Sequence, residues 1–261
     1  MSDGDRNVSD EDSEMNRTHT ITTSPCACAC EQAAPEDTSA LSAEMAEAFA
    51  TVWTVLARVL KEAPTPQVLD NVRSSELLLD WPLLGTDQQP SRVLAEGLAS
   101  LAESSRVEED AGSVADDHMR LLRGPGSAAA SPYESVHRSR EGLVFERETL
   151  QVRDWYSRFG LQAPRLDHDP DDQIHLELEF CATLLGRGLE EYYRNDEGKA
   201  QTLFANHRDF CREHLLQWAP GFFETLLRAA ETHFYRGMAG LGLDAVHQAE
   251  DLMNPAAPSA P

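Results

Sequence analysis

The sequence has little lysine and a large excess of acidic side chains. Only Lys61 and Lys199 are lysines among 22 basic residues, against 45 acidic residues, and the formal net charge is −23. A nucleic-acid partner is disfavoured, because no basic stripe exists to replace the counterions of a phosphate backbone. So acidic a composition suggests a protein that stays soluble in concentrated salt, as in haloarchaea. The alternative is an ordinary acidic protein with a solvated surface.

Other absences narrow the class of protein. No apolar run is long enough to span a bilayer, and no basic start precedes an apolar stretch, so we predict a cytoplasmic protein without a signal peptide. The five cysteines are irregularly spaced, unlike a secreted disulfide framework. The motifs of phosphate loops, dinucleotide-binding turns, serine-nucleophile elbows and zinc-protease helices are missing. We therefore predict no catalytic residue and no cofactor.

Both ends of the chain have the composition of tails. We predict a disordered acidic tail over residues 1–38, a folded domain over 39–253 and a short disordered tail over 254–261. The first tail contains Cys26, Cys28 and Cys30, and three thiols this close could hold a soft metal or a cluster. A closed structural site usually has a fourth ligand, and none is near in sequence. The alternative is a reduced, mobile tail.

Between the tails, apolar residues recur with the helical period, and no convincing run alternates with period two. The pattern predicts an all-α, single-domain helical bundle. We expect helices over residues 42–63, 66–80, 91–101, 107–122, 149–160, 171–189, 200–218 and 220–234, and a last short helix around 243–252. A loop rich in Gly and Pro follows residue 122, which is typical either of a binding loop or of a plain connector.

The helix predicted over 171–189 carries the main apolar face. The side chains expected on the opposite, solvent-facing side are Asp172, His175, Glu179 and Thr183. Glu177 falls in the middle of the apolar face, with Gln173 near its edge. A carboxylate there is costly unless it is paired or hydrogen-bonded. Glu177 is thus either a satisfied core residue or a carboxylate that faces a ligand in a cleft.

One further cluster has metal-ligand chemistry. His207, Cys211 and His214 share one face of the helix predicted over 200–218. Phe204 and Phe210 crowd this face, which favours a packing role over a metal site. We therefore predict no metal in the folded domain.

Three segments together resemble one family, the TorD/DmsD-type chaperones of molybdoenzyme maturation, which are related to NarJ. His118 to Ser135 (HMRLLRGPGSAAASPYES) is similar to that family's Tyr-x-x-Leu-Phe, Gly-Pro and Pro-x-Tyr-x-Ser loop. Pro170 to Phe180 (PDDQIHLELEF) is similar to its Pro-Asp-His-x-x-x-Glu-Leu-x-Phe segment, with Gln173 in place of His. His214 to Phe222 (HLLQWAPGF) is similar to its His-Leu-x-x-Trp-x-Pro-x-Phe segment. Order and spacing match over about residues 42–250.

The resemblance implies a cytosolic chaperone that binds the twin-arginine leader of a molybdopterin-containing oxidoreductase, its apoenzyme, or both, until the cofactor is inserted. It also implies an all-helical monomer or swapped homodimer. The leader- or client-binding positions that it implies are Leu121, Leu122, Gly124, Pro125, Pro132, Tyr133, Glu134, Ser135, Asp172, Gln173 and Glu177. Two alternatives stay open: a nucleotide hydrolase, which the missing phosphate loop opposes, and a metal-binding or metal-delivery protein that uses the N-terminal cysteines.

Overall fold

The computed structural model describes residues 41–84, 89–123, 128–139, 143–144, 146–164 and 169–253. All of these residues belong to one compact unit, Asp37–Pro261. Within them the regular elements are helices, which confirms the all-α prediction, and the one β-type pairing is an isolated bridge between Tyr133 and Gln173. The predicted tails, the three tail cysteines, Gly124 and Pro125 lie outside the described residues.

Most helix starts follow the capping residues in the sequence. Ser42, Ser91 and Asp110 each accept a backbone N–H of the first turn of the helix that follows. In chain order the elements are α1 (Ala43–Lys61), α2 (Pro66–Val72), α3 (Ser75–Leu79), α4 (Arg92–Arg106), α5 (Ala111–His118), the π-helical η1 (Met119–Arg123), α6 (Glu134–Arg138), α7 (Arg147–Arg158), α8 (Ile174–Tyr193), α9 (Glu197–Glu213), the 3₁₀ turn η2 (Leu215–Gln217), α10 (Ala219–Ala229) and α11 (His233–Met253).

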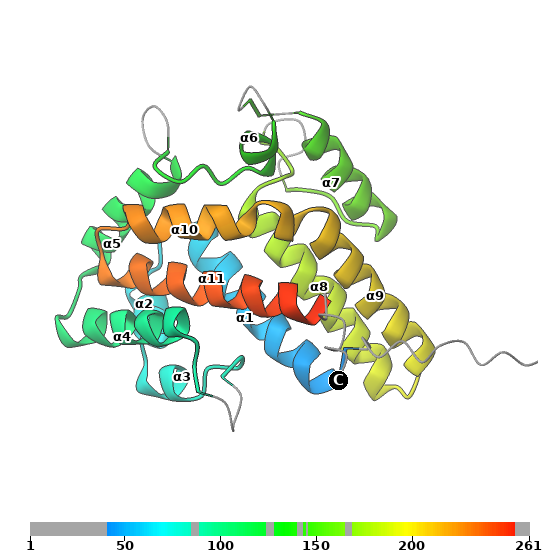
Figure 1. The fold of residues 1–261 in the computed structure, drawn as a ribbon, viewed down its shortest axis with the longest axis horizontal. Coiled ribbons are helices and arrows are strands. Elements are labelled where there is room, and N and C mark those ends of the chain that lie inside the picture. The colour runs from blue at the N-terminus through cyan, green and yellow to red at the C-terminus, as the bar shows by residue number, and fades with distance from the viewer. Residues whose placement is uncertain are drawn as a thin grey trace, which may run out of the picture. The chain divides into compact units, whose positions relative to one another are not determined.

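Two helix pairs form the centre of the bundle. α1 packs along α8, and α4 packs along α11, while α9 and α10 cover the outer sides of α8 and α11 (Figure 1). The α4–α11 crossing is close because a Cβ atom on Gly240 would lie 3.0 Å from the Cα of Gly97. The segment from α5 to α7, which contains η1 and α6, lies along one edge of the bundle (Figure 1).

Several predicted helix boundaries were wrong. The short helix expected around 243–252 is α11, 21 residues long, in which Gly237 and Gly240 are packed closely against α4 although glycine gives the sequence no apolar signal. The helix predicted over 66–80 is interrupted at Ser74, which caps α3. The helix predicted over 107–122 begins only at Ala111 and ends in the wider turn of η1. The helix predicted over 200–218 ends at Glu213.

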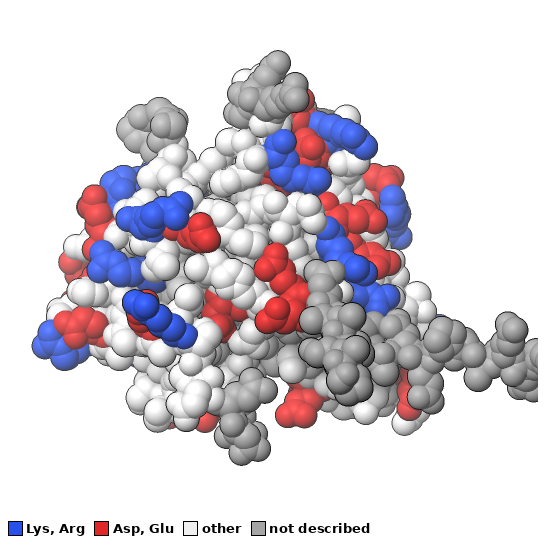
Figure 2. All heavy atoms as spheres, viewed as in Figure 1, with Lys and Arg blue, Asp and Glu red and all other residues white. Residues whose placement is uncertain are grey.

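Surface charge is mixed on the face shown in Figure 2, where acidic and basic side chains lie beside one another. Several ion pairs among the described residues join neighbours on one helix, such as Arg92 with Glu96 and Arg158 with Asp154. Exposed pairs of this kind contribute little to stability, typically below about 1 kcal/mol each. Among the described helices, none combines the length and the apolar character that crossing a membrane requires.

Candidate functional site

The segment before α6 is fixed to the start of α8 by backbone hydrogen bonds. The Glu134 N–H donates to the Asp172 carbonyl oxygen (2.9 Å), and the Ile174 N–H donates to the Pro132 carbonyl oxygen (2.9 Å). Its other end is held at η1, where the Ala130 N–H donates to the carbonyl oxygen of Leu121 (2.8 Å). The first two resemblance-derived segments are therefore joined in space. The π-helical η1 lies within the first of them, and such turns are often found at functional sites.

We call the contact between the segment before α6 and the start of α8 the junction. Asp172 stabilises the junction from inside the protein. Its carboxylate accepts the Ser135 N–H (2.7 Å) and the Thr149 hydroxyl (2.7 Å), so that it connects the start of α6 to α7. The expectation that Asp172 faces solvent was wrong, because its side chain is fully buried. The helical projection did not apply to it, since α8 begins only at Ile174.

Glu134 forms a second buried contact of the same junction. Its carboxylate lies 2.9 Å from Nδ1 of His214 and also pairs with Arg138. Both Glu134 and His214 are buried. The grouping of His214 with His207 and Cys211 was therefore wrong: α9 ends at Glu213, and His214 is turned toward α6 instead.

Glu177 is buried and hydrogen-bonded, as predicted. The Trp218 indole N–H donates to Oε2 (3.2 Å), whereas Oε1 is buried without a partner. Burial, reinforced by the negative charge of Glu134, holds the pKa of the Glu177 carboxyl well above its usual range. The neutral acid is therefore the favoured form of this group inside the protein.

A cavity of about 430 Å³ opens beside the junction, and we call it the loop cavity. It is lined by Leu60, Leu122, Arg123, Ala128, Ser131, Pro132, Tyr133, Val136, Val144, Gln173 and His175. Of the positions implied by the resemblance, Leu122, Pro132, Tyr133 and Gln173 line it. Leu121 is buried in the core, and Glu134, Ser135, Asp172 and Glu177 are buried and do not line the cavity.

The sequence analysis assigned neither Arg123 nor His175 to a site, although both line the loop cavity. His175 was expected in solvent, but it is buried at the start of α8. Burial, together with the positive charges of Lys61 and Arg123, lowers the pKa of His175 from 6.5 to about 4. The imidazole is therefore neutral near pH 7. The signal for Arg123 was its place directly before the Gly-Pro break, where a helix end meets a loop.

A smaller cavity of about 150 Å³ continues from the loop cavity and shares Arg123, Gln173 and His175 with it. Lys61 and Asp169 are among its other lining residues. In the smaller cavity Asp169 offsets these cationic groups, and Lys61 is itself paired with Glu179 (2.9 Å). Among the described residues that line the loop cavity, Arg123 carries the only charge near pH 7, so apolar and neutral polar groups of a ligand suit that cavity.

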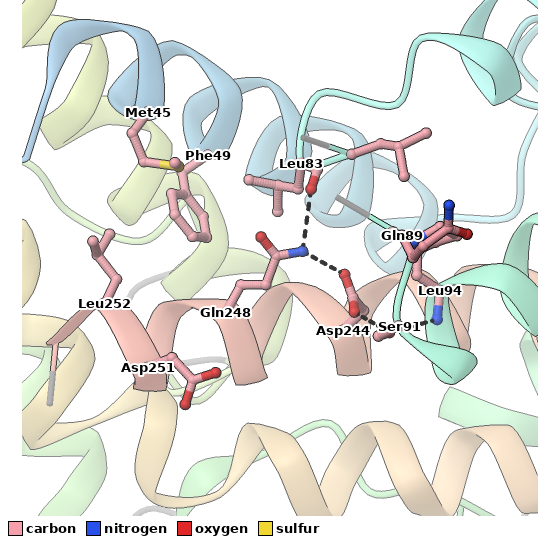
Figure 3. A pocket seen from close by; sticks show the side chains of 12 residues that line it. Met45, Phe49, Leu83, Gln89, Ser91, Leu94, Asp244, Gln248, Asp251 and Leu252 are labelled. Atoms are coloured by element: carbon pink, nitrogen blue, oxygen red, sulfur yellow. Dashed lines mark hydrogen bonds between the residues drawn. The ribbon is translucent and has the colours of Figure 1, made fainter. Parts of the chain in front are cut away.

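A second cavity, of about 390 Å³, lies where α1, α4 and α11 meet, and we call it the helix cavity (Figure 3). Met45, Phe49 and Leu252 supply apolar walls, and Gln248 donates to Asp244 (2.7 Å) and to the carbonyl oxygen of Leu83 (3.2 Å). Ser91 also hydrogen-bonds to Asp244. The sequence analysis proposed no site here.

The remaining candidate cluster is rearranged. His207 and Cys211 do lie together, but the third member is Cys181 from α8. The packing of α8 against α9 brings Cys181 into the group, and helical spacing within one segment could not reveal this.

Comparison with known proteins gives consistent similarities. Residues 87–224, more than half of the chain, match the family described as nitrate reductase delta subunit. The chain is 25% identical to the chaperone protein TorD of Aliivibrio fischeri over 48% of this chain and 57% of that protein. It is 29% identical to the Tat proofreading chaperone DmsD of Salmonella typhi over 61% of this chain and 71% of that protein. The chain thus spans less than two thirds of the first relative.

The family match covers the helices and loop that form the junction, from α4 through α10. It agrees with the resemblance seen in the three sequence segments. The chain belongs to the nitrate reductase delta subunit family, which includes chaperones of the TorD and DmsD type.

Proposed function

We propose that this chain is a cytoplasmic chaperone for a molybdopterin-containing oxidoreductase, which binds the twin-arginine leader or the apoenzyme until the cofactor is inserted. Family membership and the names of the relatives support the chaperone class. We choose the loop cavity as the binding site because the loop segment of the resemblance supplies Leu122, Pro132 and Tyr133 to its lining. The protein acts by binding and release and catalyses no reaction.

The loop cavity binds an apolar segment of the client. Leu60, Leu122 and Val136 supply apolar walls, and Tyr133 and Gln173 supply hydrogen-bonding groups. Apolar burial drives binding, because the acidic carboxylates of the junction are enclosed and Lys61 and Arg123 flank the space. The leader arginines stay at the surface.

The buried acids serve this site indirectly. Asp172 and Glu134 hold the loop and α6 in place, and Glu177 lies behind them against Trp218. We therefore assign positioning roles to Glu134, Ser135, Asp172 and Glu177, and client contact to Leu122, Pro132, Tyr133 and Gln173. Leu121 anchors the loop through its carbonyl group.

The test is titration of a fluorescent twin-arginine leader peptide with two matched variants. Val136→Ser removes a partly buried apolar group from the loop cavity, and Leu84→Ser removes one from the helix cavity. Losing the apolar contact should weaken binding by about 5- to 10-fold in Val136→Ser. Leu84→Ser should bind as the parent does. Equal weakening in both folded variants would show that the loop cavity is not the site.

The metal-handling alternative rests on the tail cysteines, outside the described residues. Replacing Cys26, Cys28 and Cys30 by Ser should leave peptide binding unchanged. Loss of binding in that variant, with its fold intact, would favour the alternative.

A further inference from the structure

Three metal-ligand side chains meet between α8 and α9. Cys181 lies on α8, and His207 and Cys211 lie one turn apart on α9. The two sulfur atoms are 3.6 Å apart, and Nε2 of His207 is 3.5 Å from the sulfur of Cys211. The three ligand atoms all lie within 4.8 Å of one another, and all three residues are buried.

These separations are close to the edges of a tetrahedral zinc site. With Zn–S bonds of about 2.3 Å and Zn–N bonds of about 2.0–2.1 Å, a regular tetrahedron has sulfur–sulfur and sulfur–nitrogen edges of about 3.8 and 3.6 Å. A disulfide, in contrast, requires a sulfur–sulfur distance of about 2.05 Å. The observed spacing fits two thiolates around an ion without a change in helix packing.

Glu177 can supply an oxygen as fourth ligand by a turn of its side chain, because its carboxyl oxygens are not among the atoms that lie within 4.8 Å of one another. Glu177 precedes Cys181 by one helical turn on α8 and is, like it, fully buried. Its Oε2 is taken by Trp218, but Oε1 is buried without a partner. Nδ1 of His207 is also buried without a partner, so no protein group fixes which ring nitrogen faces the thiols. Cysteines that merely fill a core do not explain two orphaned polar atoms beside them.

We propose that Cys181, Cys211 and His207, with Glu177 as the fourth ligand, bind a zinc ion that joins α8 to α9. Binding releases the two thiol protons and the carboxyl proton of Glu177 and leaves the imidazole neutral, so that two thiolates and one carboxylate surround the ion. Because the site is enclosed, the metal enters before the two helices close, during folding. This site departs from the sequence prediction of no metal in the folded domain, and none of its four proposed ligands lines the loop cavity.

The experiment uses the full chain with Cys26, Cys28 and Cys30 replaced by Ser, which removes the competing thiols. The protein is unfolded, stripped of metal with a chelator and refolded with zinc, and the bound metal is measured by mass spectrometry after desalting. We expect about one zinc per chain. Refolding with cobalt should give the sulfur-to-cobalt charge-transfer bands and the intense d–d bands of a tetrahedral site.

Variants on this background identify the ligands. Cys181→Ser and Cys211→Ser should lose the metal and the cobalt bands, whereas Glu177→Gln should keep the charge-transfer bands and shift the d–d bands. His247→Gln, which changes an exposed histidine, is the matched control for His207→Gln and should retain the metal.

The parent measurement decides the proposal even if a core variant fails to fold. A refolded parent that binds no zinc while both thiols titrate freely in denaturant would overturn it. So would a parent without metal in which the two thiols are oxidised to a disulfide.

Discussion

The loop cavity and the helix cavity are similar in volume but are built differently. The helix cavity is lined mainly by side chains of long helices, and its one buried acid, Asp244, bonds to the side chains of Ser91 and Gln248. The loop cavity is lined by a short segment whose backbone is held by a buried acid, Asp172. Burial of a carboxylate costs free energy. At the loop cavity, the buried carboxylate of Asp172 accepts a hydrogen bond from backbone that is not part of a regular helix. The difference indicates that the loop cavity has a shape that helix packing alone does not supply.

The strongest test of this contrast compares the two acids. Asp172→Ala leaves the Ser135 N–H and the Thr149 hydroxyl buried without an acceptor, and it should lower the free energy of unfolding by about 2–4 kcal/mol. Asp244→Ala should cost only about 1 kcal/mol, because its partners are side chains beside an open cavity. Urea unfolding of both variants measures the difference, and equal losses would remove the distinction between the two cavities.

Glu177 provides the next largest effect. Glu177→Ala orphans the Trp218 N–H and should cost about 1–3 kcal/mol in stability, client binding or both. Because the pKa of Glu177 is raised in the folded protein, the unfolded chain binds fewer protons above the ordinary glutamate pKa. Its contribution to stability therefore falls as the pH rises.

Glu177→Gln should remove that decline when unfolding is followed against pH in the presence of a chelator. A stability profile of Glu177→Gln that parallels the parent at every pH would contradict the placement of a neutral acid in the core.

His175, which lines the loop cavity, should make the stability of the folded protein depend on pH in the acidic range. Its pKa is lowered from 6.5 to about 4, so between these values the unfolded chain binds more protons than the folded one. The stability that depends on neutral His175 should be present above pH 6.5 and should be lost as the pH falls toward 4. His175→Gln should flatten this part of the profile, while His247→Gln, an exposed control, should not.

The smallest expected effect concerns salt. If apolar burial at the loop cavity drives recognition, leader-peptide affinity should hold or rise from about 0.5 M to multimolar KCl, where the screening length is about 3 Å or less. A steep fall in affinity, with the fold intact at each point, would show that surface charge governs recognition.

The sequence was sufficient for the helical class, for α8 and for the burial of Glu177, because each depends on local periodicity. It was insufficient to predict the burial of Asp172. This residue lies just before α8 begins, so a helical projection does not apply to it. His214 was misassigned, and the partner of Cys181 was not foreseen, because the contacts come from other segments, Glu134 on α6 and Cys211 on α9. Such contacts depend on how helices pack, which spacing along one helix does not encode.

The length of α11 was missed for a different reason. Glycine and alanine at its crossing with α4 are buried through close backbone approach, not through apolar side chains. The sequence also did not reveal the contrast between the two cavities, because that contrast depends on which groups donate hydrogen bonds to the buried acids.

The central position of α11 has a consequence for biosynthesis. It is the last helix along the described chain, yet most of its residues are buried against α4, α10 and α1. Helices made earlier by the ribosome therefore expose their apolar faces until residues 233–253 emerge, and the cooperative core forms only then. The helices around the loop cavity therefore reach their final packing only after residues 233–253 have been made.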